Sequence, residues 1–451
     1  MPKLHSDAAF ADFLGPELVA GLRTVEIFAP NAIQANAIPL ALSGRDLIVC
    51  AQTGSGKTLT FLLPILHQLT TGRNSQRGNH ALILAPTEQL SLQVASLASK
   101  LVVSLRSLLE LRCMEQDPTM QTRSSASAPQ LWVGTPKWLS ENISFNLKSV
   151  AMLAIDEADL LLCVPSATAG GEDLLREQRE KTEELLAAVE GAQLFLAMAH
   201  LSNEREEELQ KRFPEAQMVG HTGVMVPTLR QCFHYFKGDK DAKLFWVLSE
   251  AEKEETEPLA GSTMIFCSLP STADRLQGAL AERKPGSRPL ALHENTPAQD
   301  KATIASEFRQ GGCEILLTTD MAARGLDFPR VRHVVLFDAP VDATAFVHSA
   351  GRTARRGSIG LVTCIIEGGD AAREHIDGKI FHALQDGPQL TFAKPGVQAT
   401  VEPPRPSHPG QKEPKGRRQR GYAKPAHQWQ PKGSAPTNCI QIVLRGICPP
   451  I

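Results

Sequence analysis

The sequence predicts an α/β protein made of two tandem domains, each a doubly wound parallel sheet, followed by a disordered basic C-terminal tail. Two observations lead to this expectation. Short apolar runs alternate with helical segments in the first half of the chain, and the same alternation returns in the second half. Moreover, 451 residues are too many for one ordinary hydrophobic core.

The first predicted domain spans residues 8–222. Its apolar runs are short and unbroken, as is typical of strands buried on both faces of a parallel sheet. The predicted strands are Leu47–Cys50, Ala81–Ala85, Leu131–Val133, Met152–Ile155 and Leu194–Ala197. Helical periodicity fills the intervals between them, most clearly over Leu90–Leu105 and Glu172–Val189.

The second predicted domain spans residues 244–394 and repeats this pattern. Its predicted strands are Met264–Cys267, Leu290–Leu292, Ile315–Thr318, Val334–Phe337 and Leu361–Ile366. Residues 223–243 contain the breakers Gly223, Pro227 and Gly238, and are predicted to be a linker and the start of domain two. Over 395–451, prolines, glycines and basic residues predict a disordered tail, in which the apolar patch Ile440–Leu444 has no predicted place.

Composition narrows the class of protein. The hydrophobic fraction of 42% and charged fraction of 21% are typical of soluble globular proteins, and no apolar stretch approaches the roughly 20 residues that span a bilayer. The nine cysteines show no zinc-ligand spacing, and Cys50, Cys267 and Cys364 lie within apolar runs, as buried thiols do. We expect a reducing intracellular compartment, either nucleus or cytoplasm, with an organelle left open.

A glycine-rich segment follows the first predicted strand and precedes a helical one. Its glycines let backbone N–H groups close around phosphates, and the helix N-terminus adds its dipole. Lys57 would reach the terminal phosphates of a nucleotide and Thr58 would hold Mg²⁺. The residues of this predicted phosphate-binding loop are Ala51, Gln52, Thr53, Gly54, Ser55, Gly56, Lys57 and Thr58.

Two carboxylates follow a later strand of the same predicted sheet. The run Met152–Ile155 ends in Asp156-Glu157-Ala158-Asp159, at the carboxyl edge where ligands of open α/β sheets bind. Asp156 is the expected metal ligand, through water, and Glu157 the expected general base. Taken alone, the segment also fits an acidic helix N-cap; together with the phosphate-binding loop, it favours a nucleotide hydrolase.

These two motifs together resemble the DEAD-box family of ATP-dependent RNA helicases. The resemblance covers about Phe10 to Ile366, with the motifs in the family's order. It implies two RecA-like domains that bind ATP, Mg²⁺ and single-stranded RNA in the cleft between them. It also implies ATP hydrolysis coupled to RNA unwinding or to remodelling of RNA–protein complexes, RNA contacts mainly to the backbone, and a monomeric protein.

The resemblance assigns further residues to the nucleotide. In a segment similar to the family's Q motif, residues 8–36, Gln34 would hydrogen-bond the adenine and Phe10 would be the upstream aromatic contact. In domain two, Asp327 would contact the ribose. Arg352 and Arg355 would reach the γ-phosphate when the domains close, because a fixed planar cation neutralises charge that develops during phosphoryl transfer.

The resemblance also implies an RNA site, in which the chain departs from the family pattern. The residues it places there are Pro86, Thr87, Thr135, Pro136, Thr319, Arg324 and Gly325. Glu88-Gln89 stand where Arg-Glu is usual, although Lys137 keeps a positive charge near Thr135. The segment Met198-Ala199-His200, expected to couple ATP to strand separation, replaces Ser-Ala-Thr.

Two smaller departures also affect motifs outside the nucleotide site. Ser349 replaces the arginine of the finger motif, and Glu294-Asn295 replaces Gly-Asp.

A second hypothesis is therefore an ATP-dependent RNA clamp or scaffold with little unwinding; a P-loop ATPase acting on DNA fits less well. Eight Lys and Arg residues between Arg405 and Lys432 would supply lost phosphate affinity or bind protein partners, with a solvated end as the alternative.

Overall fold

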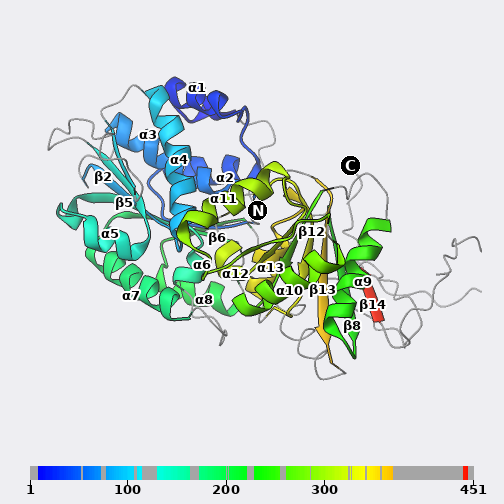
Figure 1. Ribbon diagram of the computed structural model, residues 1–451. Coiled ribbons are helices and arrows are strands. Elements are labelled where there is room, and N and C mark those ends of the chain that lie inside the picture. Colours follow the sequence, from blue (N-terminus) through cyan, green and yellow to red (C-terminus); the bar gives the residue numbers. More distant parts are fainter. Residues whose placement is uncertain are drawn as a thin grey trace, which may run out of the picture.

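Two parallel-sheet α/β units lie side by side in the computed structural model, with domain two following domain one along the chain (Figure 1). The residues that it describes are 9–51, 54–72, 78–105, 109–113, 129–162, 172–199, 201, 203–220, 228–253, 261–284, 286–323, 326, 328–340, 343–355, 358–368 and 440–444. No helix in these ranges is both long enough and apolar enough to cross a membrane.

Domain one is built on a seven-stranded sheet of order β3-β4-β2-β5-β6-β1-β7, with every pairing parallel. The order is not sequential, so helices must cross over both faces of the sheet. Its strands are β1 (Leu47–Cys50), β2 (His80–Leu84), β3 (Glu110–Cys113), β4 (Gln130–Gly134), β5 (Val150–Ile155), β6 (Gln193–Met198) and β7 (Gln217–Gly220). The helices are η1 (Phe10–Asp12), α1 (Pro16–Thr24), α2 (Ala32–Leu42), α3 (Lys57–Thr71), α4 (Glu88–Leu105), α5 (Pro136–Asn142), η3 (Leu147–Ser149), α6 (Ala158–Leu161), α7 (Glu172–Ala188) and α8 (Asn203–Arg212).

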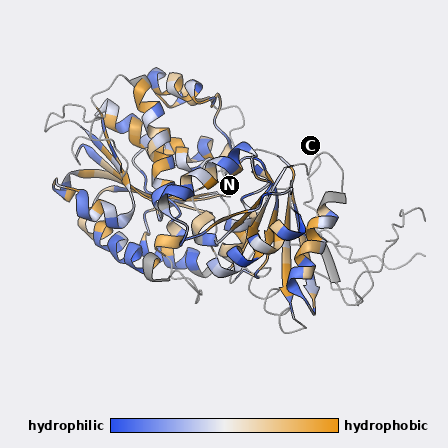
Figure 2. Cartoon of the chain, viewed as in Figure 1, coloured by the Kyte–Doolittle hydropathy of each residue, from blue (hydrophilic) through white to orange (hydrophobic). Residues whose placement is uncertain are grey.

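Each face of this sheet has its own hydrophobic core. Leu47 and Val49 of β1 pack toward α1–α4, whereas Ile48 and Cys50 pack toward α5–α8, because successive strand residues point to opposite faces. Burial on both faces explains why these strands appear in the sequence as unbroken apolar runs. The outward faces of the covering helices, α7 above all, are hydrophilic (Figure 2).

Domain two repeats the arrangement in a seven-stranded sheet of order β10-β11-β9-β12-β13-β8-β14. One core packs the sheet against α11–α13, and the other packs it against α9 and α10. Its strands are β8 (Leu229–Phe236), β9 (Ser262–Phe266), β10 (Leu290–Leu292), β11 (Ile315–Thr318), β12 (Val331–Leu336), β13 (Gly360–Glu367) and β14 (Ile440–Leu444). Its helices are α9 (Lys240–Lys253), α10 (Pro270–Arg283), α11 (Ala298–Gln310), α12 (Asp320–Ala323) and α13 (Ala343–Ala350).

The fold class and each predicted strand are confirmed, with ends shifted by a few residues. Within residues 223–243, predicted to be a linker and the start of domain two, Leu229–Phe236 form β8, which pairs with β13 inside the domain-two sheet. Polar residues such as Arg230 and Gln231 interrupt the apolar pattern of β8, so the sequence does not predict this strand. The predicted buried thiols Cys50, Cys267 and Cys364 are all in the core.

The predicted disordered tail needs correction at its apolar patch. Ile440–Leu444 forms β14, which pairs antiparallel with β8 at the edge of the domain-two sheet (Figure 1). Of the tail predicted over 395–451, only these five residues lie within the described part of the chain. The single antiparallel pairing of this sheet is therefore made by a segment distant in sequence from the rest of domain two.

Candidate active site at the domain interface

The phosphate-binding loop lies between β1 and α3, as the sequence predicts. Gly54 and Gly56 both have left-handed backbone, with φ of +80° and +79°, and a Cβ on Gly56 would come within 2.5 Å of Gln34 Nε2. Glycine is therefore required at this turn. Lys57 is buried and its Nζ donates to the Ala51 carbonyl at 2.5 Å. Gln52 and Thr53 lie outside the described residues.

The electrostatics of Lys57 suit an anionic ligand. Burial lowers the pKa of the Lys57 amine, whereas the nearby charge of Asp156, the strongest opposing influence, raises it. A buried cation that is already close to carboxylates gains further from an incoming phosphate, which brings additional negative charge. The position at the start of α3 adds the favourable helix dipole.

Thr58 and Asp156 come together although 98 residues separate them. The Thr58 hydroxyl lies 3.5 Å from Asp156 Oδ2, because α3 and the end of β5 meet at the carboxyl edge of the sheet. Burial and the charge of Glu157 raise the pKa of Asp156 to about 7, against the lowering influence of Lys57. Two hard oxygen ligands fit Mg²⁺, which keeps waters and phosphate oxygens as its other ligands. Within the described residues, no group of three or more His, Cys, Asp or Glu side chains is placed to hold a metal alone.

Glu157 has the geometry of a reactive residue rather than of a helix cap. It occupies the N-cap position of α6 but its side chain accepts no capping hydrogen bond. Its backbone is left-handed, with φ 49° and ψ 48°, a strained conformation for a non-glycine residue. Glu157 Oε2 is buried without a hydrogen-bond partner among the described residues. A buried carboxylate oxygen that accepts no other hydrogen bond is suited to accept a proton from water.

Gln34 links the predicted adenine-reading segment to the phosphate-binding loop. Its Nε2 donates to the Gly56 carbonyl at 3.1 Å, and its Oε1 accepts from the Asn31 N–H at 3.1 Å. Asn31 caps α2 in return and donates from Nδ2 to the Ser55 carbonyl at 2.7 Å. Asn31 is a site residue that the sequence reasoning missed. Its signal was present, because Asn followed three residues later by Gln is a capping box.

Phe10, the predicted aromatic contact to adenine, is buried, whereas Phe28 is exposed. Phe10 is 2% exposed and packs in the core of domain one, edge-on against Phe13. Its ring therefore has no free face for stacking, and its predicted contact with adenine is not supported by this geometry. Phe28, three residues before Asn31, is 73% exposed. Its exposed ring, six residues before Gln34 in the sequence, is free to stack against a ligand, which the buried ring of Phe10 is not.

Arg355 lies over the phosphate-binding loop from domain two. A Cβ on Gly54 would lie 3.6 Å from Arg355 Cγ, and Arg355 Nε donates to the Gly351 carbonyl at 2.9 Å. Arg352 is buried and donates to the Leu326 carbonyl at 3.0 Å. The structure thus brings Arg355 to the predicted phosphates and directs Arg352 to the chain just before Asp327, which itself lies outside the described residues.

A buried acid–histidine pair joins the two domains. His348 Nε2 of α13 lies 3.1 Å from Asp159 Oδ2 of α6, and the same oxygen accepts from the Ala199 N–H at 3.2 Å. Burial would raise the pKa of Asp159, but the charge and hydrogen bond of His348 lower it to about 2. The sequence predicts neither Asp159 nor His348 as a site residue, because their meeting depends on how the two domains are placed.

Comparison with known proteins decides the family. A model described as DEAD/DEAH box helicase matches residues 31–189, and one described as helicase conserved C-terminal domain matches residues 247–357. The ATP-dependent rRNA helicase rrp3 of Aspergillus fumigatus is 33% identical over 81% of this chain and 73% of its own length. The chain is a DEAD-box RNA helicase.

Two further comparisons support the same family and fold. DEAD-box ATP-dependent RNA helicase 36 of Arabidopsis thaliana is 35% identical to this helicase, over 79% of this chain and 69% of that protein. A solved structure of S. cerevisiae Dbp5 bound to RNA and ADP BeF3 is 25% identical, with a TM-score of 0.66 over 82% of this chain and 92% of the other. The helicase is accordingly an ATP-hydrolysing enzyme with two RecA-like domains.

The predicted RNA residues of domain one lie where helices begin. The Thr87 hydroxyl accepts from the Leu90 N–H, and the Thr135 hydroxyl accepts from the Trp138 N–H, both at 3.3 Å. A hydroxyl that accepts still has its own proton to donate, so each can serve a phosphate oxygen. Pro86 and Pro136 are buried beside them. Glu88 is exposed in the first turn of α4, where it adds negative charge.

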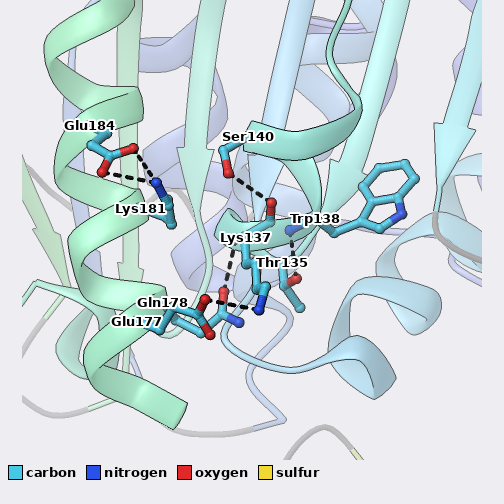
Figure 3. Close-up of polar contacts among 8 residues, drawn as sticks. All are labelled: Thr135, Lys137, Trp138, Ser140, Glu177, Gln178, Lys181 and Glu184. Carbon is cyan, nitrogen blue, oxygen red and sulfur yellow. Dashed lines mark hydrogen bonds and ion pairs between the residues drawn. The ribbon is translucent and has the colours of Figure 1, made fainter. Parts of the chain in front are cut away.

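Lys137, predicted to keep a positive charge near Thr135, holds that charge in an ion pair. Its ammonium pairs with Glu177 of α7 at 2.9 Å, and its N–H donates to Gln178 Oε1 at 3.0 Å. Figure 3 shows Lys137 turned toward α7 and Trp138 turned away from it. The hydrogen bond and charge of Glu177 raise the pKa of Lys137. Its cation is already partnered at the position predicted to face RNA.

Some of the remaining residues predicted to bind RNA or to couple it to ATP lie within the described part of the chain, and others do not. Thr319 follows β11 and its hydroxyl donates to Glu294 at 2.9 Å. Ser349 donates to the Ala345 carbonyl and lies 3.4 Å from Asp320. Met198 and Ala199 are buried at the end of β6, and Ala199 belongs to the hydrophobic core of domain two. The predicted residues that lie outside the described ranges are His200, Arg324 and Gly325.

Proposed function

We propose that this helicase couples ATP hydrolysis to local separation of RNA strands or to remodelling of RNA–protein complexes. The observation that carries the proposal is the position of Arg355, whose Cγ lies 3.6 Å from where a Cβ on Gly54 would be, across the domain interface. It supports a site that is complete only when the domains are closed, so that closure and hydrolysis depend on each other. The Asp159–His348 pair supports the same closed arrangement.

The residues around the nucleotide have complementary roles. Lys57 and the loop N–H groups would bind the phosphates, Gln34 would recognise the adenine, and Glu157 would take the proton of the attacking water. Thr58 and Asp156 would hold Mg²⁺, which when bound neutralises phosphate charge. Arg355, fixed by the Gly351 carbonyl, would stabilise the charge that develops on the transferring group.

RNA would lie across the carboxyl edges of both sheets, where the predicted RNA residues gather. Thr87 and Thr135 would donate to backbone phosphates from domain one. The structurally similar Dbp5 was solved bound to RNA, which supports an RNA site on this fold. Contacts of this kind carry little sequence information, so the choice of RNA would come from elsewhere.

The alternative is an ATP-dependent clamp that holds RNA with little unwinding. The acidic Glu88 and the partnered Lys137 favour it, because both weaken attraction to phosphates. One contact opposes it. Asp159 reaches the Ala199 backbone N–H at 3.2 Å, so the loss of the usual hydroxyls leaves this link between the ATP site and β6 in place.

One experiment separates the two functions. ATP turnover is measured with and without single-stranded RNA, and duplex separation is measured in the same preparation. The proposal expects RNA-stimulated turnover together with strand separation. RNA-stimulated turnover without strand separation would support the clamp instead of the helicase function. Turnover that does not change when RNA is added would contradict both functions.

The basic segment Arg405–Lys432 would add phosphate affinity. The chain leaves domain two at the end of β13 and returns at β14, where Ile440 pairs with Tyr235. Both points lie at the carboxyl edge of the sheet, the edge that carries Thr319 after β11. This placement supports a role of the segment beside the RNA.

Neutralising the eight basic residues of this segment should therefore weaken RNA binding and flatten its salt dependence. Each lost phosphate contact reduces the slope of log K against log salt by about 0.7. The variant must keep Ile440–Leu444, because truncation at residue 395 would also remove β14 from the sheet. An unchanged slope in equilibrium binding titrations would show that the segment is only a solvated part of the chain.

A further inference from the structure

An acidic side chain occupies the predicted RNA-facing edge of domain two. Glu294 follows β10, and its Oε1 accepts a hydrogen bond from the Thr319 hydroxyl at 2.9 Å. Its Oε2 is buried without a hydrogen-bond partner among the described residues. Lys301 of α11 donates to the Glu294 carbonyl at 3.1 Å, which fixes the turn but leaves the carboxylate directed at Thr319.

The hydrogen bonding of Thr319 differs from that of Thr87 and Thr135. All three hydroxyls accept from a backbone N–H near a helix start, for Thr319 from Ala322 at 3.4 Å. A hydroxyl has a single proton to donate, and that of Thr319 goes to Glu294. Thr319 therefore has no proton left for a phosphate oxygen while Glu294 stays in place.

We propose that Glu294 is an intramolecular competitor for the RNA phosphate that Thr319 would otherwise bind. The inference rests on the proposed function, in which Thr319 contacts the RNA backbone. Carboxylate and phosphate are both anionic acceptors, so they compete for one donor and repel each other at close range. RNA binding to domain two then requires Glu294 to rotate away from Thr319, and only RNA held firmly by its other contacts displaces it.

The proposal is tested by affinity for a labelled single-stranded oligouridylate, measured on the full chain with a non-hydrolysable ATP analogue. Glu294→Ala removes the competitor, and Glu294→Gln removes its charge while keeping its shape, in case the smaller side chain disturbs the turn. We expect Glu294→Ala to bind about fivefold to tenfold more tightly, and Glu294→Gln to show a smaller gain. The matched control Glu282→Ala, which removes an exposed glutamate of α10, should stay within about twofold of wild type.

A double substitution shows whether the effect passes through Thr319. In a Thr319→Val background, Glu294→Ala should give little or no gain, because the contested donor is gone. An equal gain there, or no gain from either Glu294 variant in the native background, would overturn the proposal. If wild type neither binds RNA nor responds to it in turnover, the proposed function fails as well; wild-type binding without a gain in the variants overturns this inference alone.

Discussion

Replacing Glu157 by Gln should reduce the ATP turnover number by about 10²–10⁴-fold while leaving ATP affinity nearly unchanged. The introduced amide would keep the shape of the side chain but lose the basic oxygen that is buried and unpartnered at Glu157 Oε2. The left-handed backbone at Glu157 is imposed by the structure around it, and Gln has the same size and branching as Glu, so the site should still form.

Turnover is measured at saturating ATP and RNA, and nucleotide affinity is measured separately by equilibrium titration. Glu190→Gln is the matched control, because it makes the same change at an exposed position just after α7. A Glu157→Gln enzyme that hydrolyses ATP at the wild-type rate would show that another group accepts the proton. Loss of ATP affinity together with turnover would instead show that Glu157 is needed to build the site.

Replacing Arg355 by Ala should reduce turnover by about 10³-fold or more, as loss of an arginine finger does in other phosphoryl-transfer enzymes. Arg355 packs over Gly54 across the interface, and its guanidinium is oriented by the Gly351 carbonyl. Arg355→Lys should recover only part of the rate, because an ammonium retains the charge but lacks the planar fork of donors.

Single-turnover hydrolysis with RNA present measures this effect without interference from product release. Arg283→Ala is the control: this arginine ends α10, on the side of domain two opposite the carboxyl edge of its sheet. If Arg355→Ala retains wild-type chemistry, the charge must come from elsewhere, and Arg352 becomes the candidate finger despite its contact with the Leu326 carbonyl.

The nucleotide half of the site was predictable because its determinants are local. The turn at Gly54–Gly56 needs left-handed backbone, and the lysine and threonine that follow are fixed by the start of α3. Asp156 was predictable because an apolar run that ends in acids places them at the carboxyl edge of a parallel sheet. Both inferences use only short-range pattern and a general property of α/β folds.

The RNA half was less predictable because it depends on which side chains meet across long separations. The sequence places Lys137 beside Thr135 but does not place Glu177 next to it, since that requires α5 to pack on α7. Glu294 is visibly unusual in the sequence, yet its bond to Thr319 appears only when β10 and β11 pair. Strand β8 was missed because polar residues break its pattern, and β14 because its partner is distant in sequence.

Strand β14 changes the topology of the C-terminal region. Glu367 of β13 lies beside Phe236 of β8, and Ile440 of β14 lies beside Tyr235 on the other side of the same strand. Residues 369–439 are thereby anchored at both ends, at points two strand spacings or about 10 Å apart. A single proteolytic cut between residues 369 and 439 would leave one fragment covalently attached to β13 and the other attached through the pairing of β14 with β8. A strand that displaces β14 from β8 would remove the second of the two attachments of this part of the chain to the domain-two sheet.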